Sequence, residues 1–232
     1  MILREVGRSD LKVSYRFVVV AALFVTCLIT ANIIIAKQIS IGGIVLPAAI
    51  IIFPLSYIIG DVLTEVYGYR QARMVIWLGF LCNLIAVLAI WIGRILPPAP
   101  VFDAQAAYER ILGSTPRFLI ASFAAYLAGE FTNSVVLSKM KILTKGRWLW
   151  TRTIGSTLVG QGVDTVVVLS IAFVGVLPLS VLGVMMFFHW LVKCVYETLA
   201  TPVTYVVVSY LKRKEGVDVY DYGVDFNPLR VV

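Results

Sequence analysis

Two pairs of acid and amide side chains lie deep inside long apolar runs of this sequence. Glu130 and Asn133 are three residues apart, as are Gln161 and Asp164, so each pair lies on one face of a helix. The surrounding strings, GEFTNS and GQGVDT, both read small residue, acid or amide, two residues, acid or amide, hydroxyl. This likeness suggests a vestige of an internal repeat.

Further polar side chains interrupt other apolar runs. His189, Lys193 and Glu197 step by four residues and form one stripe along the last run. Lys193 and Glu197 can pair across one helical turn, which would offset much of the cost of burying them. Asn32 and Asn83 add uncharged hydrogen-bonding groups to two earlier runs.

The cost of burying charge separates binding groups from packing groups. A charged side chain at the centre of a spanning helix costs about 2.5–3.5 kcal/mol, whereas an interhelical hydrogen bond returns only about 0.6 kcal/mol. Glu130 and Asp164 therefore predict a polar cavity near the midplane, between the fourth, fifth and sixth spans. For the asparagines Asn32 and Asn83 and for His189, simple helix–helix bonding is an equal alternative. The residues predicted to bind a substrate are Glu130, Asn133, Gln161, Asp164, Lys193, Glu197 and Asn32.

The second apolar run carries its own pair of acids. Asp61 and Glu65 are one helical turn apart and lie toward the predicted cytoplasmic side, near Arg70 and Arg73 in the sequence. They are candidates for gating or coupling through ion pairs, and simple interfacial pairing is an equal alternative. Two prolines in the same run predict a kinked or broken helix, as in transporter segments that form binding sites.

The elements that position these residues follow from composition. The chain has 232 residues, of which 60% are hydrophobic and 14% charged, and its mean hydropathy is +0.92. These values predict an all-α integral membrane protein, since soluble chains are roughly 45–50% apolar. We expect a single domain, residues 1–232, built as a bundle of six transmembrane helices. The predicted spans are 17–36, 44–66, 74–96, 118–137, 154–175 and 179–211.

The distribution of positive charge predicts the orientation. With six spans, 15 of the 20 Lys and Arg residues fall on the side that holds both termini. Four fall on the other side, and Lys193 lies within a span. The positive-inside rule therefore places the N- and C-termini in the cytoplasm. Residues 215–232 are expected to form a cytoplasmic appendage.

Several classes of function are excluded or disfavoured. The sequence has no P-loop motif and only one histidine, and its three cysteines form no C-x-x-C pair. We therefore expect no catalytic residues, no metal site and no cofactor. The net charge of +7 reflects topology, so no nucleic-acid partner is expected. The loop between the third and fourth spans carries a candidate short helix at 103–112, either a plain surface helix or a lid.

Long strings in this chain resemble the queuosine precursor transporters, which were earlier grouped as vitamin-uptake-like membrane proteins. The string PLSYIIGDVLTEVYG at 54–68 carries the resemblance first, and GEFTNS and GQGVDT extend it. Further matching segments are 137–141, 146–152, Lys193, 197–202 and 215–228. The resemblance spans nearly the whole chain. It implies a six-helix importer of 7-deazaguanine bases in the cytoplasmic (inner) membrane of a bacterium.

The implied substrate suits the polar residues. A 7-deazaguanine presents a ring N–H and an exocyclic amine beside a carbonyl, so a carboxylate such as Glu130 or Asp164 can accept both donors. Asn133, Gln161 or Lys193 can donate to the carbonyl. A second acid would suit the cationic aminomethyl precursor.

Two other readings remain open. The chain could be the substrate-binding subunit of an ATP-driven vitamin importer, with an energy-coupling partner, or it could carry substrate alone or with protons. An intramembrane enzyme is disfavoured because the sequence has no G-x-S-x-G string.

Overall fold

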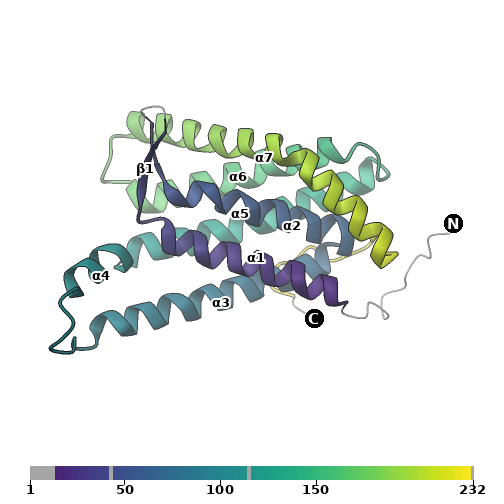
Figure 1. The fold of residues 1–232 in the computed structure, drawn as a ribbon. Helices are drawn as coiled ribbons and strands as arrows, with labels where there is room; N and C mark the ends of the chain where they lie inside the picture. The colour runs from purple at the N-terminus through teal and green to yellow at the C-terminus, as the bar shows by residue number, and fades with distance from the viewer. Residues whose placement is uncertain (1–13, 42–43, 114–115, 231–232) are drawn as a thin grey trace.

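The computed structural model describes residues 14–41, 44–113 and 116–230. Within these residues, six helices are long and apolar enough to cross a membrane, which confirms the predicted fold class. They lie side by side in one bundle (Figure 1). The helices that carry these spans are α1 (Tyr15–Ile34), α2 (Phe53–Tyr67), α3 (Tyr69–Ile95), α5 (Pro116–Leu143), α6 (Leu149–Phe173) and α7 (Leu179–Glu215). The short helix α4 (Gln105–Leu112) lies between α3 and α5 in the sequence.

The second span is broken, as its prolines predict, but it does not begin as a helix at residue 44. Strands β1 (Gln38–Ile41) and β2 (Ile44–Pro47) form an antiparallel hairpin, and a 3-10 turn (Ala48–Ile51) follows. Pro54 lies in the first turn of α2, where its missing N–H breaks no helical bond. The 15 residues of α2 extend about 22 Å, less than the roughly 30 Å of a hydrocarbon core. The 3-10 turn therefore completes this span, which runs from Ala48 to Tyr67.

The other predicted spans overlap helices α1, α3, α5, α6 and α7, and their ends differ by a few residues from the predicted bounds. Helix α3 begins at Tyr69 instead of 74, directly after Gly68, whose φ of +83° makes the sharp turn from α2. The predicted short helix at 103–112 is present as α4, which buries none of its residues. The beginning of α1 and the C-terminal tail lie at one end of the bundle, and α4 and the hairpin lie at the other (Figure 1).

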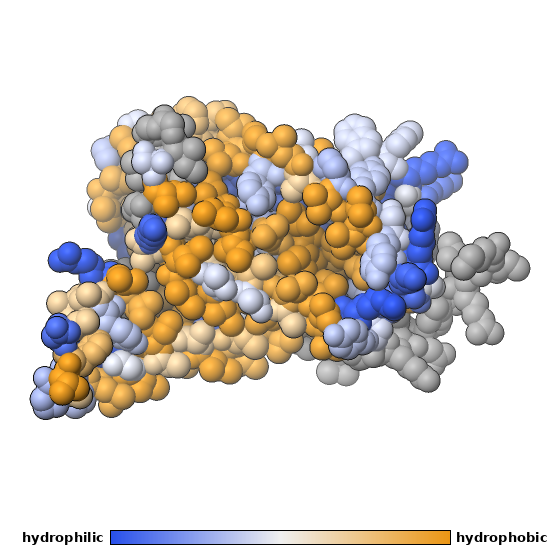
Figure 2. Space-filling view, viewed as in Figure 1, coloured by the Kyte–Doolittle hydropathy of each residue, from blue (hydrophilic) through white to orange (hydrophobic). Residues whose placement is uncertain are grey.

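The outer surface of the bundle is mostly apolar. Large hydrophobic side chains on every long helix are exposed, including Leu23 on α1, Ile85 on α3 and Leu199 on α7. Hydrophilic side chains gather at the tail end and around α4 (Figure 2). This apolar belt between two polar ends is the surface that a bilayer covers, so the chain is a multi-pass membrane protein.

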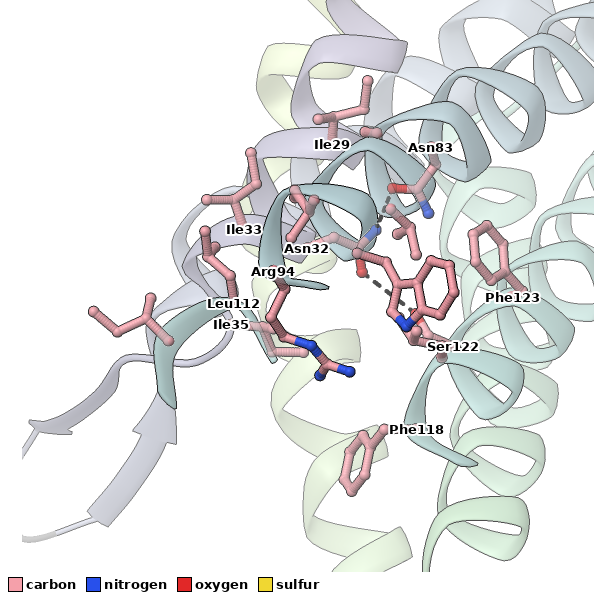
Figure 3. A pocket seen from close by; sticks show the side chains of 16 residues that line it. Ile29, Asn32, Ile33, Ile35, Asn83, Arg94, Leu112, Phe118, Ser122 and Phe123 are labelled. Carbon is pink, nitrogen blue, oxygen red and sulfur yellow. Dashed lines mark hydrogen bonds between the residues drawn. The ribbon is translucent and has the colours of Figure 1, made fainter. Parts of the chain in front are cut away.

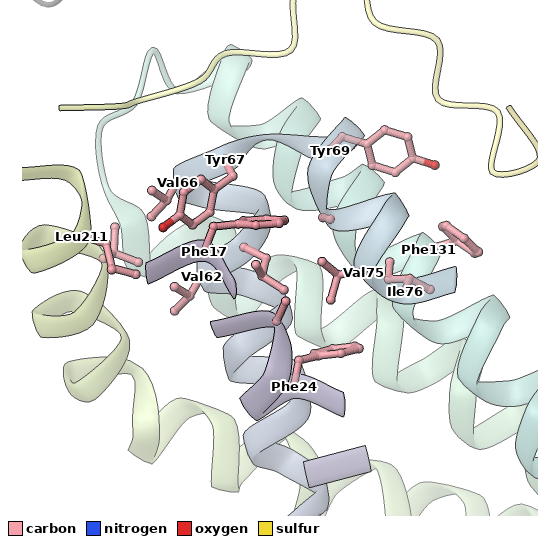
Figure 4. Packing of buried hydrophobic residues seen from close by; sticks show 14 of the residues in the cluster. Phe17, Phe24, Val62, Val66, Tyr67, Tyr69, Val75, Ile76, Phe131 and Leu211 are labelled. Atoms are coloured by element: carbon pink, nitrogen blue, oxygen red, sulfur yellow. The ribbon is translucent and has the colours of Figure 1, made fainter. Parts of the chain in front are cut away.

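A compact apolar core joins the helices near the tail end. Phe17 and Phe24 of α1 pack with Val62 and Val66 of α2, and Leu211 of α7 closes the cluster (Figure 4). The rings of Phe17 and Tyr67 meet edge to face, with centroids 5.0 Å apart. This core holds α2 rigidly among its neighbours.

The tail after α7 is docked and is not the loose appendage that its polar sequence suggests. The Asp221 carboxylate accepts hydrogen bonds from the backbone N–H of Tyr69 at 2.9 Å and from the Ser138 hydroxyl at 2.6 Å. Arg73 donates to the carbonyl of Asn227 at 2.7 Å, and Trp77 donates to the carbonyl of Pro228 at 2.8 Å. The tail thus satisfies the free N-terminus of α3, which local sequence leaves uncapped.

We predict that Asp221→Ala destabilises the protein by about 1–3 kcal/mol, because it strands a buried N–H and a buried hydroxyl. Thermal unfolding in detergent measures the loss. Asp225→Ala is the matched control, since that carboxylate is exposed and bonds only within the tail. Equal stability of the Asp221 and Asp225 variants would contradict the capping role.

The predicted orientation can be tested with two exposed positions at opposite ends, Val101 in the loop before α4 and Leu143 at the end of α5. We expect a membrane-impermeant maleimide to label Val101→Cys in intact spheroplasts and Leu143→Cys only after lysis. The wild-type protein, with its three native cysteines, gives the background. The reverse pattern would place the termini outside.

Candidate functional site

The crossing of α5 and α6 brings the two similar strings together. A Cβ atom at Gly129 would lie 2.8 Å from the Cβ of Asp164, and one at Gly160 would lie 2.6 Å from the Cβ of Asn133. Both distances are far below the 3.5–4.0 Å of carbon–carbon contact. Each helix therefore presses a glycine against the polar residue of the other, in a reciprocal arrangement.

This crossing places the four acid and amide residues of the two strings in the interior. Glu130, Asn133 and Gln161 are completely buried, and Asp164 is 4% exposed. The Glu130 carboxylate packs against α2, because a Cβ atom at Gly60 would lie 3.0 Å from its Oε2. The acids and amides from the two helices thus lie together, as their spacing predicts.

Lys193 on α7 bonds to Asp164 of α6 and not to Glu197 on its own helix. Its Nζ donates to Oδ2 of Asp164 at 2.5 Å and lies 5.0 Å from the centre of the Phe53 ring. The predicted Lys193–Glu197 pair is wrong. Asp164 offers a buried acceptor across the helix interface, and Glu197 instead lies near Thr157 on α6.

Helix α2 adds Asp61 to this group. The Asn133 side-chain amide donates to Oδ1 of Asp61 at 2.7 Å, and the Asp61 side chain is completely buried. Among the described residues, Asp61 forms no ion pair with Arg70 or Arg73, the cations that follow it in the sequence. Its position on the inner face of α2 directs it into the bundle, and Arg73 binds the tail instead.

Many polar atoms of this cluster have no hydrogen-bond partner among the described residues. Leaving such a group buried costs about 1–3 kcal/mol, and more for a charge. Both carboxylate oxygens of Glu130 and both amide atoms of Gln161 are in this state. The remaining unpartnered atoms of the cluster are Tyr57 Oη, Asp61 Oδ2, Asn133 Oδ1, Thr165 Oγ1 and Glu197 Oε2. A ligand with matching donors and acceptors would recover this energy.

Tyr57 is the residue that sequence reasoning left out of the predicted site. Its side chain is completely buried and lies near Asp164 and Glu130. Its hydroxyl reaches the α5–α6 crossing, where it would collide with any side chain at Gly129. The available signal was its spacing, one helical turn before Asp61 on the same face of α2.

A cavity adjoins this cluster. Asp164, Lys193 and His189 line one side of it and Phe53 and Tyr126 line others, and the space between its walls, including its mouth, is about 790 Å³. Tyr126 also neighbours Glu130. The cavity therefore reaches Asp164 from the side of α1 and the hairpin.

A second hollow continues toward α4. It is lined by Trp91, Arg94 and Phe118 and shares Asn32 and Asn83 with the first cavity. Figure 3 shows Asn32 between the asparagine of α3 and the serine of α5. Asn32 Nδ2 donates to Asn83 Oδ1 at 3.1 Å, and the Ser122 hydroxyl donates to Asn32 Oδ1 at 3.4 Å. Asn32 thus lies at the boundary of the two hollows, apart from Glu130 and Gln161.

Glu65 belongs to a different cluster, at the tail end. Its carboxylate accepts two bonds from the Arg152 guanidinium, at 2.7 and 2.8 Å, and a third from Lys212 at 2.5 Å. Lys141 Nζ lies 3.6 Å from the same carboxylate and donates to the Glu65 carbonyl at 2.6 Å. These partners come from α5, α6 and α7, so Glu65 is an ion-pair centre that closes this end of the bundle.

The tail contributes Asp218 to the Glu65 cluster. Asp218 accepts from Lys141 at 2.6 Å and from Lys212 at 2.8 Å. Burial alone would raise the pKa of Asp218, but the two ammonium groups bring this pKa below its usual value. Because the pKa of Asp218 is lowered in the folded protein, its ion pairs stabilise the fold fully when the pH is above the ordinary pKa of an aspartate. This stabilisation is lost as the pH falls through the lowered pKa.

Comparison with known proteins identifies the family of the chain. Residues 47–207 match the sequence family described as putative vitamin uptake transporter. The chain belongs to this family. The matched segment contains every predicted substrate-binding residue except Asn32. No solved structure matches the chain.

Two relatives carry a more specific name. A probable queuosine precursor transporter of Bacillus subtilis (strain 168) is 29% identical over 189 residues, 81% of this chain and 82% of the relative. A probable queuosine precursor transporter of Haemophilus influenzae (strain ATCC 51907 / DSM 11121 / KW20 / Rd) is 27% identical over 121 residues, 52% of this chain and 49% of that relative.

We predict that Glu65→Gln destabilises this transporter-family protein by about 3–5 kcal/mol, because three buried or half-buried cations lose their common carboxylate. Thermal unfolding in detergent measures the effect. Glu109→Gln, the same substitution on the exposed face of α4, should leave the melting temperature within experimental error. A Glu65 variant as stable as that control would show that the cluster does not hold the helices together.

Proposed function

We propose that this chain imports 7-deazaguanine precursors of queuosine across the cytoplasmic membrane of a bacterium. The observation that carries the proposal is the set of buried, unpartnered hydrogen-bonding groups around Glu130. The family of the chain and the printed names of its two relatives support the same substrate. The site residues act by binding, and none is assigned a catalytic role.

Glu130 is the best acceptor for the guanine-like edge of the substrate. Both of its oxygens are free of partners, so they can accept the ring N–H and the exocyclic amine together. Asp164 is less suited to this role because Lys193 occupies one of its oxygens. Charge-assisted bidentate bonds of this kind are about twice as strong as neutral ones.

Gln161 and Tyr57 complete the recognition of the ring. The Gln161 side chain offers an unpartnered donor and an unpartnered acceptor, and its amide can donate to the substrate carbonyl. The Tyr57 hydroxyl can serve either role. A base without the exocyclic amine would strand one oxygen of Glu130, so the site would reject it strongly.

The two ends of the bundle give the site an entrance and a closure. The cavity and the outer hollow extend from the acids toward the hairpin and α4. At the opposite end, Glu65 and its cations hold α2, α5, α6 and α7 together. With the orientation predicted from positive charge, substrate enters from outside and leaves when the Glu65 cluster opens. Asp61, bonded to Asn133, links the binding cluster to the same helix as Glu65 and is the candidate coupling residue.

The test is uptake of labelled 7-deazaguanine precursors into proteoliposomes that contain only this protein. We expect saturable uptake of chemically unaltered substrate, with no partner ATPase. Glu130→Gln should lower uptake at limiting substrate at least tenfold, since each lost charge-assisted bond is worth about 1.5–3 kcal/mol and 1.4 kcal/mol is tenfold in binding.

The control for this experiment is Glu109→Gln, which should transport as the wild type does. Thermal unfolding confirms that each variant is folded. Unchanged uptake by both Glu130→Gln and Asp164→Asn would refute the binding scheme. Uptake that appears only with an added ATPase would favour a binding subunit of an ATP-driven importer.

A further inference from the structure

The carboxylates around Glu130 outnumber the cations available to them. Glu130 lies within electrostatic range of Asp61 and Asp164, and Glu197 lies within range of Asp61 and Glu130. Among the described residues, Lys193 is the cation that pairs with any of these acids, and Asp164 holds it at 2.5 Å. Asp61, Glu130 and Glu197 therefore share a buried region without an ion-pair partner on the described chain.

The nearby cations of the tail end are already committed. Glu65 and Asp218 hold Lys141 and Lys212, and Glu65 also holds Arg152 through two bonds. Moving any of them to the central acids would leave Glu65 buried with too few partners. A positive charge that pairs with the central acids would therefore have to come from a bound molecule.

Neighbouring uncharged groups indicate that a molecule of some size binds there. The side chains of Tyr57 and Gln161 are completely buried and have polar atoms without partners in the described structure. No group of three or more His, Cys, Asp or Glu residues in the described segments is arranged to hold a metal ion. These acids lie beside the cavity that Asp164 and Lys193 line, and their unpartnered oxygens suit an organic cation with N–H donors.

We infer that Glu197 binds the ammonium group of a positively charged substrate, so that the site selects the aminomethyl precursor over the neutral nitrile precursor. This inference rests on the proposed function. Glu197 is 2% exposed, and its Oε2 has no partner within the described chain. Asp61 is less available, because its Oδ1 already accepts from Asn133.

The guanine-like edge and the ammonium group of the ligand are bound by acids on different helices, so one site can recognise both. Glu130 on α5 accepts from the guanine-like edge, and Glu197 on α7 pairs with the substituent. An ammonium group in this region offsets the cost of the carboxylate charge, whereas a nitrile leaves the carboxylate unpaired.

The experiment measures uptake of both precursors by the wild type and by Glu197→Gln in the same proteoliposomes. The readout is the ratio of aminomethyl to nitrile uptake at equal limiting concentrations. We expect a ratio above ten in the wild type, a fall of at least tenfold in Glu197→Gln, and substantial recovery in Glu197→Asp. Glu109→Gln is the matched control and should keep the wild-type ratio.

Each outcome decides between the two proposals. A wild-type ratio near or below one, or a ratio that Glu197→Gln leaves unchanged, overturns the inference while uptake itself upholds the proposed function. Absence of uptake of both precursors by the folded wild type overturns the proposed function and the inference with it. If Glu197→Gln does not fold, the wild-type ratio and the ratio in Glu197→Asp still test the selection, and a wild-type ratio near one refutes it.

Discussion

The carboxylate of Glu65 is the interaction on which the closed end of the bundle depends. It lies on α2, the shortest of the six spans, and binds Arg152 of α6 and Lys212 of α7 while its backbone binds Lys141 of α5. A buried carboxylate is stable only when its charge is matched and its lone pairs are used. Glu65 meets both conditions, so it fixes the helices that carry the central acids.

Glu130 is the same residue type in the opposite state. Both glutamates are completely buried, yet every oxygen of Glu65 is bonded and neither oxygen of Glu130 has a partner on the described chain. An unsatisfied buried carboxylate costs stability that folding alone does not recover. Within one protein, the contrast separates an acid that holds helices together from the acid to which we assign the proposed binding role. The tight α5–α6 crossing at Gly129 and Gly160 holds the polar side chains of the two helices at close range.

The sequence predicted the parts of this architecture that follow from hydropathy and local spacing. Six spans, the break in the second and the burial of Glu130 and Asp164 all follow from the bilayer as solvent. The hydrogen-bond and ion-pair partners across the bundle could not be predicted from the sequence. A side chain one helical turn away competes with side chains on other helices, and only tertiary packing decides which of these lie near. Lys193 donates to Asp164, which is 29 positions away in the sequence, and not to Glu197. Glu65 pairs with Arg152, which is 87 positions away in the sequence. The docked tail was missed for the same reason, since its polar composition resembles that of a solvated segment until Asp221 meets the N-terminus of α3.

The two clusters are linked through α2, which carries Asp61 and Glu65 one helical turn apart. Asp61 is bonded to Asn133 at the centre, and Glu65 is bonded to the cations at the closed end. A ligand that draws Asn133 or Asp61 toward itself therefore acts on the same helix that seals the exit. The tail acid Asp218 shares Lys141 and Lys212 with Glu65, so these cations keep a partner if α2 moves away. Under the proposed function, that sharing would lower the cost of opening the closed end and would give the docked tail a part in transport as well as in stability. A rigid seal made by Glu65 alone would have to strand three cations at every cycle.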